Sequence, residues 1–440
     1  MFLEEAFQRR FFERLLQSQY LPAEDIVFRQ REVLAPLLRH AHAHTRFYRT
    51  RLDVLFRTDG SIDWDRWVDI PVVTRSDVLA DPDAFYPDRP SPEDGPTGDI
   101  KTSGSTGKRM VVRYNQRTAL ATRAVKWRAD LWHHVDWSRT LYVRRGEHPD
   151  QAEWPKGERL GPWGPPWDER ARRGTAFRLH KQVPNDQQIE FISRIGAAYL
   201  APAGPKMAQA LALEVERQGL NLRLNGIFTS GEQVDSLDQA ACRRVFGTEI
   251  VDVYSSKEGN HMAHRCPEHP WYHVNAETVL LEILDSNGNP CRPGEIGRVV
   301  VTPLYSTAQP LIRYDHQDLA TLGEQCSCGR TLPVLSSFLG RVAHLFRHPD
   351  GRVLKRNLPD EYREILQAGP WQIAQVGPND YQLRYVPLDW NRVGDEASVQ
   401  QAFKRIFFAD ASLTFKRVGA IAPIASGKYI EYVNEYNPPS

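Results

Sequence analysis

The chain has no long apolar run, few cysteines and almost no net charge. No apolar stretch reaches the roughly 18 residues that a membrane-spanning helix needs. The formal net charge of +1 is too small for a protein that holds nucleic acid through a basic surface. Five cysteines in 440 residues do not make a disulfide framework. We therefore expect neither a membrane nor a nucleic acid as partner.

A targeting segment and internal repeats are also missing. The N-terminal MFLEEAFQRRFFERLL mixes charged and apolar residues at helical spacing and lacks the apolar stretch of a signal peptide. We expect a cytoplasmic protein on this ground. No repeat or low-complexity tract occurs, and the 41% apolar and 25% charged residues are ordinary for a globular protein. The length predicts two or three domains.

The hydrophobic pattern predicts an α/β fold. Residues 1–55 have helical periodicity. Between residues 186 and 260, predicted helices (186–196, 205–218, 235–246) alternate with short strands (AAYLAP, GIFTS, EIVDVY), which is typical of βαβ units with a parallel sheet. Residues 279–284 and 298–304 form a predicted antiparallel pair. The pattern changes after Gly340, so we predict a large multi-sheet domain at 1–341 and a small α+β domain at 342–440.

The stretch IKTSGSTGKR, residues 100–109, is the first candidate for a binding loop. Glycine lets the backbone approach a phosphate, hydroxyls add donors, and Lys108 adds charge. A P-loop is excluded, because Thr102 stands where its first glycine would be and Arg109 stands where Ser or Thr must follow the lysine. A solvated turn between two strands remains the alternative on this stretch alone.

Further motifs accompany this loop. TSGSTGK resembles the phosphate loop of the adenylate-forming superfamily of acyl-CoA ligases and adenylation domains. These enzymes join a carboxylate to AMP and pass the acyl group to a thiol or an amine. Five more stretches resemble the family's motifs in the family's order: TSGE (229–232), DVYSSKEG (252–259), LIRYDHQDL (311–319), FLGR (338–341) and ASGKY (425–429).

Within the superfamily the chain is most similar to the phenylacetate-CoA ligase and CapK-like group. That likeness rests on LLRHAHAHTRFYR (37–49), HVNAETVLLEIL (273–284), PLIRY (310–314) and CSCGRTLP (326–333). The resemblance implies the adenylate-forming fold, with a large AMP-binding domain and a small C-terminal lid domain. It implies ATP and Mg²⁺ as cofactors, a carboxylic acid as substrate, and CoA, an amine or a carrier-protein thiol as acceptor.

The resemblance also implies roles for single residues. Glu258 corresponds to the Mg²⁺ ligand, Tyr254 to the residue that packs on adenine, and Asp318 to the carboxylate that binds the ribose. Lys428 corresponds to the catalytic lysine that bonds the substrate carboxylate. The other residues implied to bind the nucleotide are Thr102, Ser103, Gly104, Ser105, Thr106, Gly107, Lys108, Gly231, Glu232, Ser255, Ser256 and Arg341. Taken alone, Glu258 is more readily read as a surface carboxylate, Asp318 as a turn cap and Lys428 as a solvated lysine.

The chain departs from the family pattern at several positions. Lys257 occupies a position that is usually Ser or Thr, beside the α-phosphate. Because its side chain brings a full positive charge there, we count Lys257 among the catalytic candidates. Ser255 and Gln317 replace glycines, and Asp315 replaces the common arginine. The acidic pair expected at the hinge after Arg341 is absent. These changes put the transfer step in doubt more than the adenylation step.

Three cysteines and one histidine have the spacing of a metal site. Cys266 and His269 form Cys-x2-His, and Cys326 and Cys328 form Cys-x-Cys on the far side of the predicted antiparallel pair. Four nitrogen and sulfur ligands suit a structural, tetrahedral Zn²⁺. His264 and His273 are alternative nitrogen donors, and the other reading is free cysteines beside surface histidines.

Three functions remain in competition. The first is activation of a carboxylic acid followed by transfer to CoA. The second sends the acyl group to an amine or a carrier-protein thiol. The third is a nucleotide-binding regulatory or scaffold protein that has lost catalysis. We expect the acid pocket near residues 201–204, 229–231 and 254–260. The sequence names neither the acid nor the oligomeric state, for which a homodimer is one option.

Overall fold

The computed structural model describes residues 2–92, 94–102, 109–144, 153–167, 173–180, 182–202, 204–234, 236–341, 346–350, 353–354, 358–359, 361–421 and 431–436. The chain divides into two compact units. The first comprises Met1–Ile100, Val112–His316 and Thr321–Ser337, and the second comprises Lys101–Val111, Gln317–Ala320 and Phe338–Ser440. The predicted domain boundary after Arg341 stays a prediction.

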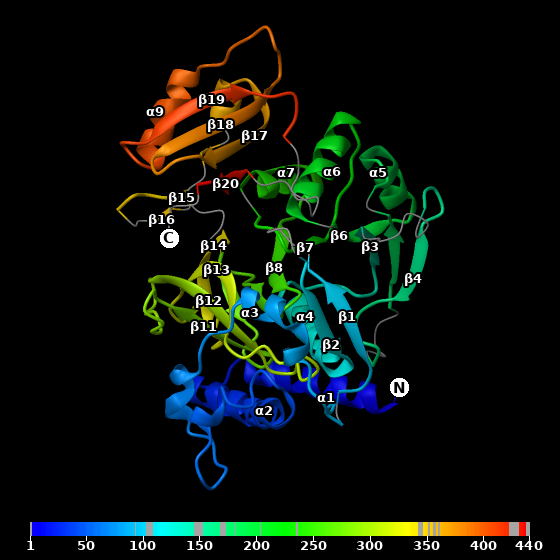
Figure 1. Ribbon diagram of the computed structural model, residues 1–440. Helices are drawn as coiled ribbons and strands as arrows, with labels where there is room; N and C mark the ends of the chain where they lie inside the picture. The colour runs from blue at the N-terminus through cyan, green and yellow to red at the C-terminus, as the bar shows by residue number, and fades with distance from the viewer. Residues whose placement is uncertain are drawn as a thin grey trace. The chain divides into compact units, whose positions relative to one another are not determined.

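A twelve-stranded mixed sheet forms the centre of the first unit (Figure 1). Its strand order is β11-β12-β13-β14-β10-β9-β8-β7-β6-β3-β5-β4. The strands are β3 (Thr140–Arg144), β4 (Glu158–Pro162), β5 (Thr175–Leu179), β6 (Ala197–Ala201), β7 (Gly226–Ser230), β8 (Ile250–Ser256), β9 (Asn260–Arg265), β10 (Tyr272–Val274), β11 (Val279–Leu284), β12 (Ile296–Pro303), β13 (Tyr314–Leu322) and β14 (Val334–Arg341).

The parallel part of this sheet runs through β5, β3, β6, β7 and β8. Three crossover helices pack on it: α5 (Asn185–Arg194), α6 (Pro205–Arg217) and α7 (Ser236–Phe246). Their apolar faces share one buried core with the strands, including Leu200, Leu211 and Ile227. The predicted alternation over residues 186–260 is confirmed, as is the antiparallel pairing of β11 with β12.

Helices from the N-terminal part of the chain complete the first unit. They are α1 (Phe2–Ser18), α2 (Ala23–His44), α3 (Arg75–Ala80) and α4 (Gln116–Trp132), with short 3-10 turns η1 (Asp53–Leu55), η2 (Trp64–Asp69) and η3 (Pro82–Phe85). β1 (Thr97–Lys101) pairs with β2 (Val111–Asn115). α1 packs on α4, where the rings of Phe12 and Trp127 meet edge to face at 6.3 Å. No described helix has the length and apolar character to cross a membrane.

The second unit contains a four-stranded sheet in the order β19-β18-β17-β20. Aromatic side chains fill its core, with Trp371, Tyr381 and Phe403 almost fully buried. Its described elements are β15 (Phe346–Arg347), β16 (Val353–Leu354), α8 (Glu361–Ile365), β17 (Ala368–Gln375), β18 (Asp380–Pro387), α9 (Glu396–Ile406), β19 (Ser412–Arg417) and β20 (Tyr432–Asn434). This is a small α+β unit.

Candidate active site and a candidate metal centre

Three predicted site segments lie at one edge of the sheet. β6, β7 and β8 are adjacent and parallel, so their carboxyl ends share an edge, where α/β sheets commonly bind ligands. The segments 201–204, 229–232 and 254–258 follow or end these strands. A Cβ atom built on Gly204 would lie 2.9 Å from Glu232 Oε2, so the Glu232 carboxylate lies against the first segment. The structure thus brings Gly231, Glu232 and the YSSKEG segment to neighbouring strand ends.

The tip of the β8–β9 hairpin carries Lys257 and Glu258. Ser256 pairs with Asn260 across the hairpin, and the Gly259 amide donates to Ser256 Oγ at 2.8 Å. This tight turn separates the two charged side chains: Lys257 is exposed, whereas the Glu258 side chain is only 6% exposed. Arg75 Nη1 lies 3.6 Å from Glu258 Oε1. Nothing in the sequence indicated that Arg75 would reach this carboxylate.

Tyr254 is oriented by a residue that the sequence analysis did not identify. Its hydroxyl lies 3.2 Å from Nδ1 of His316, and the two rings meet edge to face at 5.8 Å. His316 precedes Asp318 by two residues on β13, and both side chains are buried. Tyr254 therefore contacts the strand that carries the predicted ribose carboxylate.

One departure from the family motif lies at a residue with an unusual backbone conformation. Gln317 stands at a glycine position of that motif and has φ +64°, a left-handed conformation that side-chain-bearing residues rarely adopt. Gln317 thus keeps the strained backbone conformation that suits the glycine of the family motif. Asp315, the replacement for an arginine, forms an ion pair with Arg298 at 3.1 Å.

The remaining nucleotide candidates are described only in part. Thr102 is buried and pairs with Met110 twice: its amide donates to the Met110 carbonyl at 2.8 Å, and its Oγ1 accepts from the Met110 amide at 3.0 Å. These bonds close the base of the phosphate-loop candidate. Ser103–Lys108 and Lys428 lie outside the described residues, as does the side chain of Arg341, whose backbone ends β14.

A buried acid joins the strands beneath this edge. Asp252 on β8 accepts hydrogen bonds from Thr229 Oγ1 at 3.1 Å and from the Tyr272 hydroxyl at 3.0 Å. Burial raises the pKa of the Asp252 carboxyl to about 6, against a lowering contribution from the two hydroxyls. Because Thr229 begins the TSGE segment, Asp252 fixes that segment to its neighbour.

We expect Asp252→Asn to remove part of the pH dependence of stability. The pKa of Asp252 lies near 6 in the folded state and at 3.8 ordinarily, so its stabilising contribution is complete below pH 3.8 and lost as the pH rises through 6. This difference predicts a fall of about 3 kcal/mol in the free energy of unfolding. The variant should show a correspondingly smaller fall in chemical denaturation between pH 4 and 7. An identical slope in both proteins would contradict the assignment.

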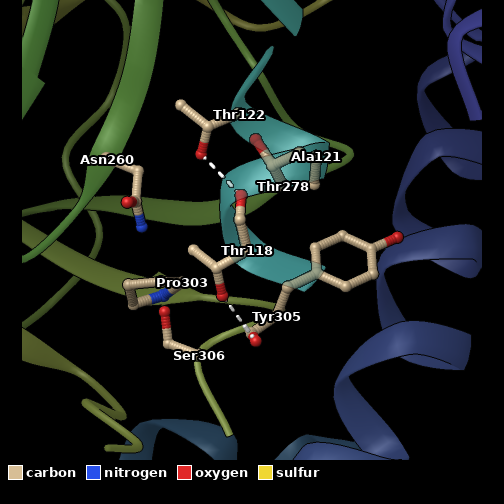
Figure 2. A pocket seen from close by; sticks show the side chains of 8 residues that line it. All are labelled: Thr118, Ala121, Thr122, Asn260, Thr278, Pro303, Tyr305 and Ser306. Carbon is tan, nitrogen blue, oxygen red and sulfur yellow. Dashed lines mark hydrogen bonds between the residues drawn. The ribbon is translucent and has the colours of Figure 1, made fainter. Parts of the chain in front are cut away.

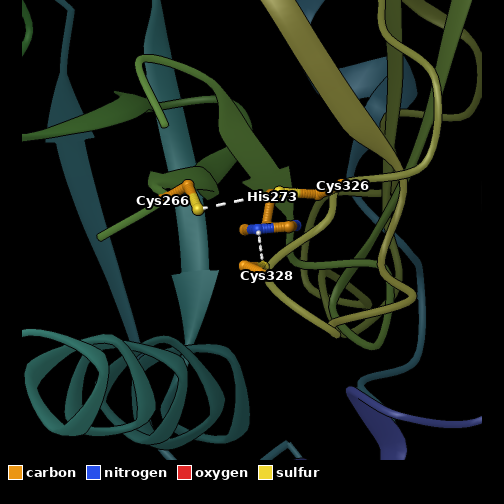
Figure 3. A group of neighbouring side chains, drawn as sticks. All are labelled: Cys266, His273, Cys326 and Cys328. Atoms are coloured by element: carbon orange, nitrogen blue, oxygen red, sulfur yellow. Dashed lines mark hydrogen bonds between the residues drawn. The ribbon is translucent and has the colours of Figure 1, made fainter. Parts of the chain in front are cut away.

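A cluster of three cysteines and one histidine forms a candidate metal centre (Figure 3). The ligand atoms of Cys266, His273, Cys326 and Cys328 all lie within 4.8 Å of one another. Cys266 Sγ and Cys326 Sγ are 3.8 Å apart, and Cys328 Sγ is 3.2 Å from His273 Nε2. Tetrahedral Zn²⁺, with bonds of about 2.3 Å to sulfur and 2.0 Å to nitrogen, separates its ligands by roughly 3.5–3.8 Å. The donor set and spacing therefore fit zinc.

The nitrogen donor of this cluster is His273, the alternative, and not His269. His269 lies in the exposed turn after β9, where its Nε2 is 2.8 Å from Ser327 Oγ and its ring stacks on Trp271 at 4.9 Å. His273 is on β10, fully buried, with its ring 5.6 Å from that of Trp132. Burial, aided by the charge of Arg330, lowers the pKa of His273 to about 4, so the ring is neutral.

A small polar niche lies beside the β8–β9 hairpin (Figure 2). Its lining combines hydroxyls of α4 with Asn260 and the segment after β12: Thr118, Ala121, Thr122, Asn260, Thr278, Pro303, Tyr305 and Ser306. Thr118 Oγ1 donates to the Tyr305 carbonyl at 2.8 Å, and the Tyr305 ring turns towards Phe11 of α1. The volume of about 10 Å³ suits one water molecule. It is too small for a carboxylic acid, so we do not assign the acid pocket to it.

No protein-family model matches the chain. Phenylacetate-coenzyme A ligase from Thermus thermophilus is 30% identical over 146 residues, which are 31% of this chain and 33% of that protein. The match thus spans about a third of that relative.

Solved structures match over most of the chain. A structure of 2-hydroxyisobutyryl-CoA ligase in the postadenylation state with 2-HIB-AMP has a TM-score of 0.69 and 17% identity, covering 95% of this chain and 91% of that one. O-succinylbenzoate coenzyme A synthetase from Bacillus subtilis, solved with ATP and magnesium, has a TM-score of 0.52 at 14% identity, covering 76% and 68%. The amide bond synthetase McbA from Marinactinospora thermotolerans has 0.50 at 16%, covering 75% and 66%. The predicted α/β class is confirmed, and the chain has the fold of the adenylate-forming ligases.

Proposed function

We propose that this protein activates a carboxylic acid as an acyl-adenylate and transfers the acyl group to CoA. One observation carries the proposal most directly. The segments TSGE and YSSKEG, at the ends of the neighbouring strands β7 and β8, meet at the carboxyl edge of β6–β8 and present the buried carboxylate of Glu258 there. This edge belongs to a fold shared with ligases that were solved with acyl-AMP and with ATP and magnesium.

The adenylation step requires groups that stabilise negative charge on the phosphates. A substrate carboxylate oxygen attacks the α-phosphorus of ATP, the bond to the bridging oxygen breaks, and pyrophosphate leaves. Negative charge develops on phosphate oxygens, so cations and amides must be fixed around them. The donors proposed for this are the loop 102–108 with Lys108, the exposed Lys257, and Lys428. Asp318 is proposed for the ribose hydroxyls and Arg341 for the ribose and phosphate.

Glu258 is the proposed holder of Mg²⁺. A carboxylate oxygen is the ligand that this hard cation prefers, and no hydrogen bond from the described residues reaches the Glu258 carboxylate. Its contact with Arg75, at 3.6 Å, is an ion pair that is too long for a hydrogen bond. The bound cation would neutralise phosphate charge, while the hairpin keeps the carboxylate in place.

In the second half-reaction the acceptor attacks the acyl carbonyl and AMP leaves. A CoA thiol is proposed because 2-hydroxyisobutyryl-CoA ligase was solved with CoA and 2-HIB-AMP, at a TM-score of 0.59 to this chain. An amine acceptor is the alternative, which the likeness to the amide bond synthetase favours. Transfer to a carrier-protein thiol is a third route.

The test is pyrophosphate exchange. The purified protein, ATP, Mg²⁺ and labelled pyrophosphate are incubated with aromatic, aliphatic and hydroxylated acids in turn. We expect label to enter ATP only in the presence of particular acids, and the active acid is then offered CoA or amines to identify the acceptor. Absence of acid-dependent exchange across the panel would refute the proposed adenylation.

We also propose that Cys266, His273, Cys326 and Cys328 hold one structural Zn²⁺. Support comes from the donor set and from spacings close to those of tetrahedral zinc. Four protein ligands leave no open position for a substrate, so the ion would be structural. It would join the turn after β9 to the segment before β14.

A further inference from the structure

Arg75 and Glu258 form a buried pair of opposite charges within the first unit. Their side chains are 8% and 6% exposed, and Nη1 of the arginine lies 3.6 Å from Oε1 of the glutamate. That distance is longer than a hydrogen bond but short enough for a strong ionic attraction in a region with little water. The pair has no counterpart among the sequence motifs, because Arg75 lies outside every one of them.

Arg75 is held in this position by structure on both sides. It is the first residue of α3, whose start is fixed by a capping box: the Thr74 amide donates to Asp77 Oδ2 at 2.8 Å, and the Asp77 amide donates to Thr74 Oγ1 at 3.2 Å. A capping box of this kind satisfies amides that would otherwise lack acceptors, so it fixes the residue at which α3 begins. The side chain of Arg75 therefore leaves from a defined point.

The residues just before Arg75 are bound to strand β13. The Val73 amide donates to the Arg313 carbonyl at 2.9 Å, and the Asp315 amide donates to the Val73 carbonyl at 2.8 Å. The Arg313 guanidinium in turn donates to the Val68 and Ile70 carbonyls, each at 2.7 Å. The segment that presents Arg75 is thus tied to the strand carrying His316, whose ring contacts Tyr254.

A guanidinium beside a carboxylate changes what that carboxylate can bind. It supplies the positive charge that the buried Glu258 needs when no ligand is present. It also repels a divalent cation that arrives alone, because the cation must come close to Arg75. A cation that arrives with a polyphosphate carries excess negative charge, which the same guanidinium attracts. Arg75 should therefore weaken binding of the free cation and strengthen binding of the cation–nucleotide complex.

We propose that Arg75 is a positioning and selectivity residue that makes Glu258 accept a divalent cation only together with the ATP phosphates. The proposal rests on the proposed function, since it takes Glu258 as the cation ligand and ATP as the nucleotide. It adds a residue from the N-terminal half of the chain and predicts opposite effects on two separate binding equilibria. A loss of folding would weaken both.

The test uses Mn²⁺ as a paramagnetic substitute for Mg²⁺. Free Mn²⁺ is followed by electron paramagnetic resonance during titration of the full-length protein, first alone and then with α,β-methylene-ATP. For Arg75→Met we expect tighter binding of Mn²⁺ alone and weaker binding of the Mn²⁺–nucleotide complex, each on the order of tenfold. Arg75→Lys, which keeps the charge, should retain the wild-type order. Arg75→Gln should behave as Arg75→Met and serves if the methionine variant does not fold.

Arg128→Met is the matched control. Arg128 is fully buried in α4 and pairs with Glu277 at 2.6 Å, so its loss also removes a buried cation, but from a different pair. Both Mn²⁺ equilibria should stay at wild-type values in a folded sample of this variant. Equal shifts of both equilibria in the same direction, or none, in the Arg75 variants would overturn the inference alone. Wild-type protein that binds no nucleotide with Mn²⁺ would overturn the proposed function as well.

Discussion

Replacing Glu258 with Gln should lower acid-dependent pyrophosphate exchange by about 100-fold or more, the size expected when a fixed group that stabilises transition-state charge is lost. The amide has nearly the shape of the carboxylate but carries no charge, so it is a poor ligand for Mg²⁺. The hairpin should keep its conformation, because Ser256 and Gly259 close it without the Glu258 side chain. The rate is measured at saturating acid over a series of Mg²⁺ concentrations.

The dependence on Mg²⁺ separates a lost ligand from a damaged fold. If Glu258 holds the cation, the variant should need far more Mg²⁺ to reach half of its remaining rate. The control is Glu324→Gln, since Glu324 is an exposed carboxylate in the turn after β13 and should leave the Mg²⁺ requirement unchanged. A Glu258→Gln protein with the wild-type rate and the wild-type Mg²⁺ requirement would show that the cation is held elsewhere.

The βαβ part of the fold was predictable because its signals are local. Each of α5, α6 and α7 carries one apolar face, and the strands between them are short and apolar, so the alternation is visible in sequence. The motifs at the ends of β7 and β8 then reach one edge for a topological reason: parallel neighbours end together. No knowledge of side-chain packing was needed for either step.

Contacts between distant segments were not predictable. Arg75 reaches Glu258 only because Val73 pairs with β13, and His316 meets Tyr254 only because the sheet brings β13 and β8 within reach. No periodicity encodes these meetings, and a lone Arg or His in a sequence is most often an ordinary surface or core residue. The exposure of Lys257 beside the buried Glu258 likewise depends on the geometry of the hairpin turn.

The sequence also failed to identify which histidine joins the three cysteines of the metal centre. Cys-x2-His spacing pointed to His269, but Cys266 to Trp271 forms a closed turn in which the Cys266 amide donates to the Trp271 carbonyl at 2.8 Å. The turn leaves His269 outside. His273 lies on β10, paired with Val334 of β14, where the cysteines of the second loop precede that strand. The register of β10 against β14 decides which histidine supplies the nitrogen donor, and the spacing of residues in the sequence does not reveal that register.

Cys326→Ser should abolish binding of one Zn²⁺ per chain and lower the free energy of unfolding by roughly 2–5 kcal/mol, as loss of a cross-link between distant segments does. The ion would tie the turn after β9 to the Cys-x-Cys loop, and the variant would have to hold these two segments together by hydrogen bonds and packing. Metal content is measured on protein purified without chelator, and stability by chemical denaturation.

Two matched pairs make this prediction specific. His273→Ala should lose the zinc, whereas His269→Ala should keep it, because only the first imidazole lies among the three sulfur atoms. Cys291→Ser is the control for the cysteine variant: Cys291 is buried but lies with its Sγ against the Ile296 carbonyl, outside the cluster. Far less than one zinc per wild-type chain would refute the metal centre. Zinc loss in His269→Ala together with retention in His273→Ala would instead show that the exposed turn supplies the ligand.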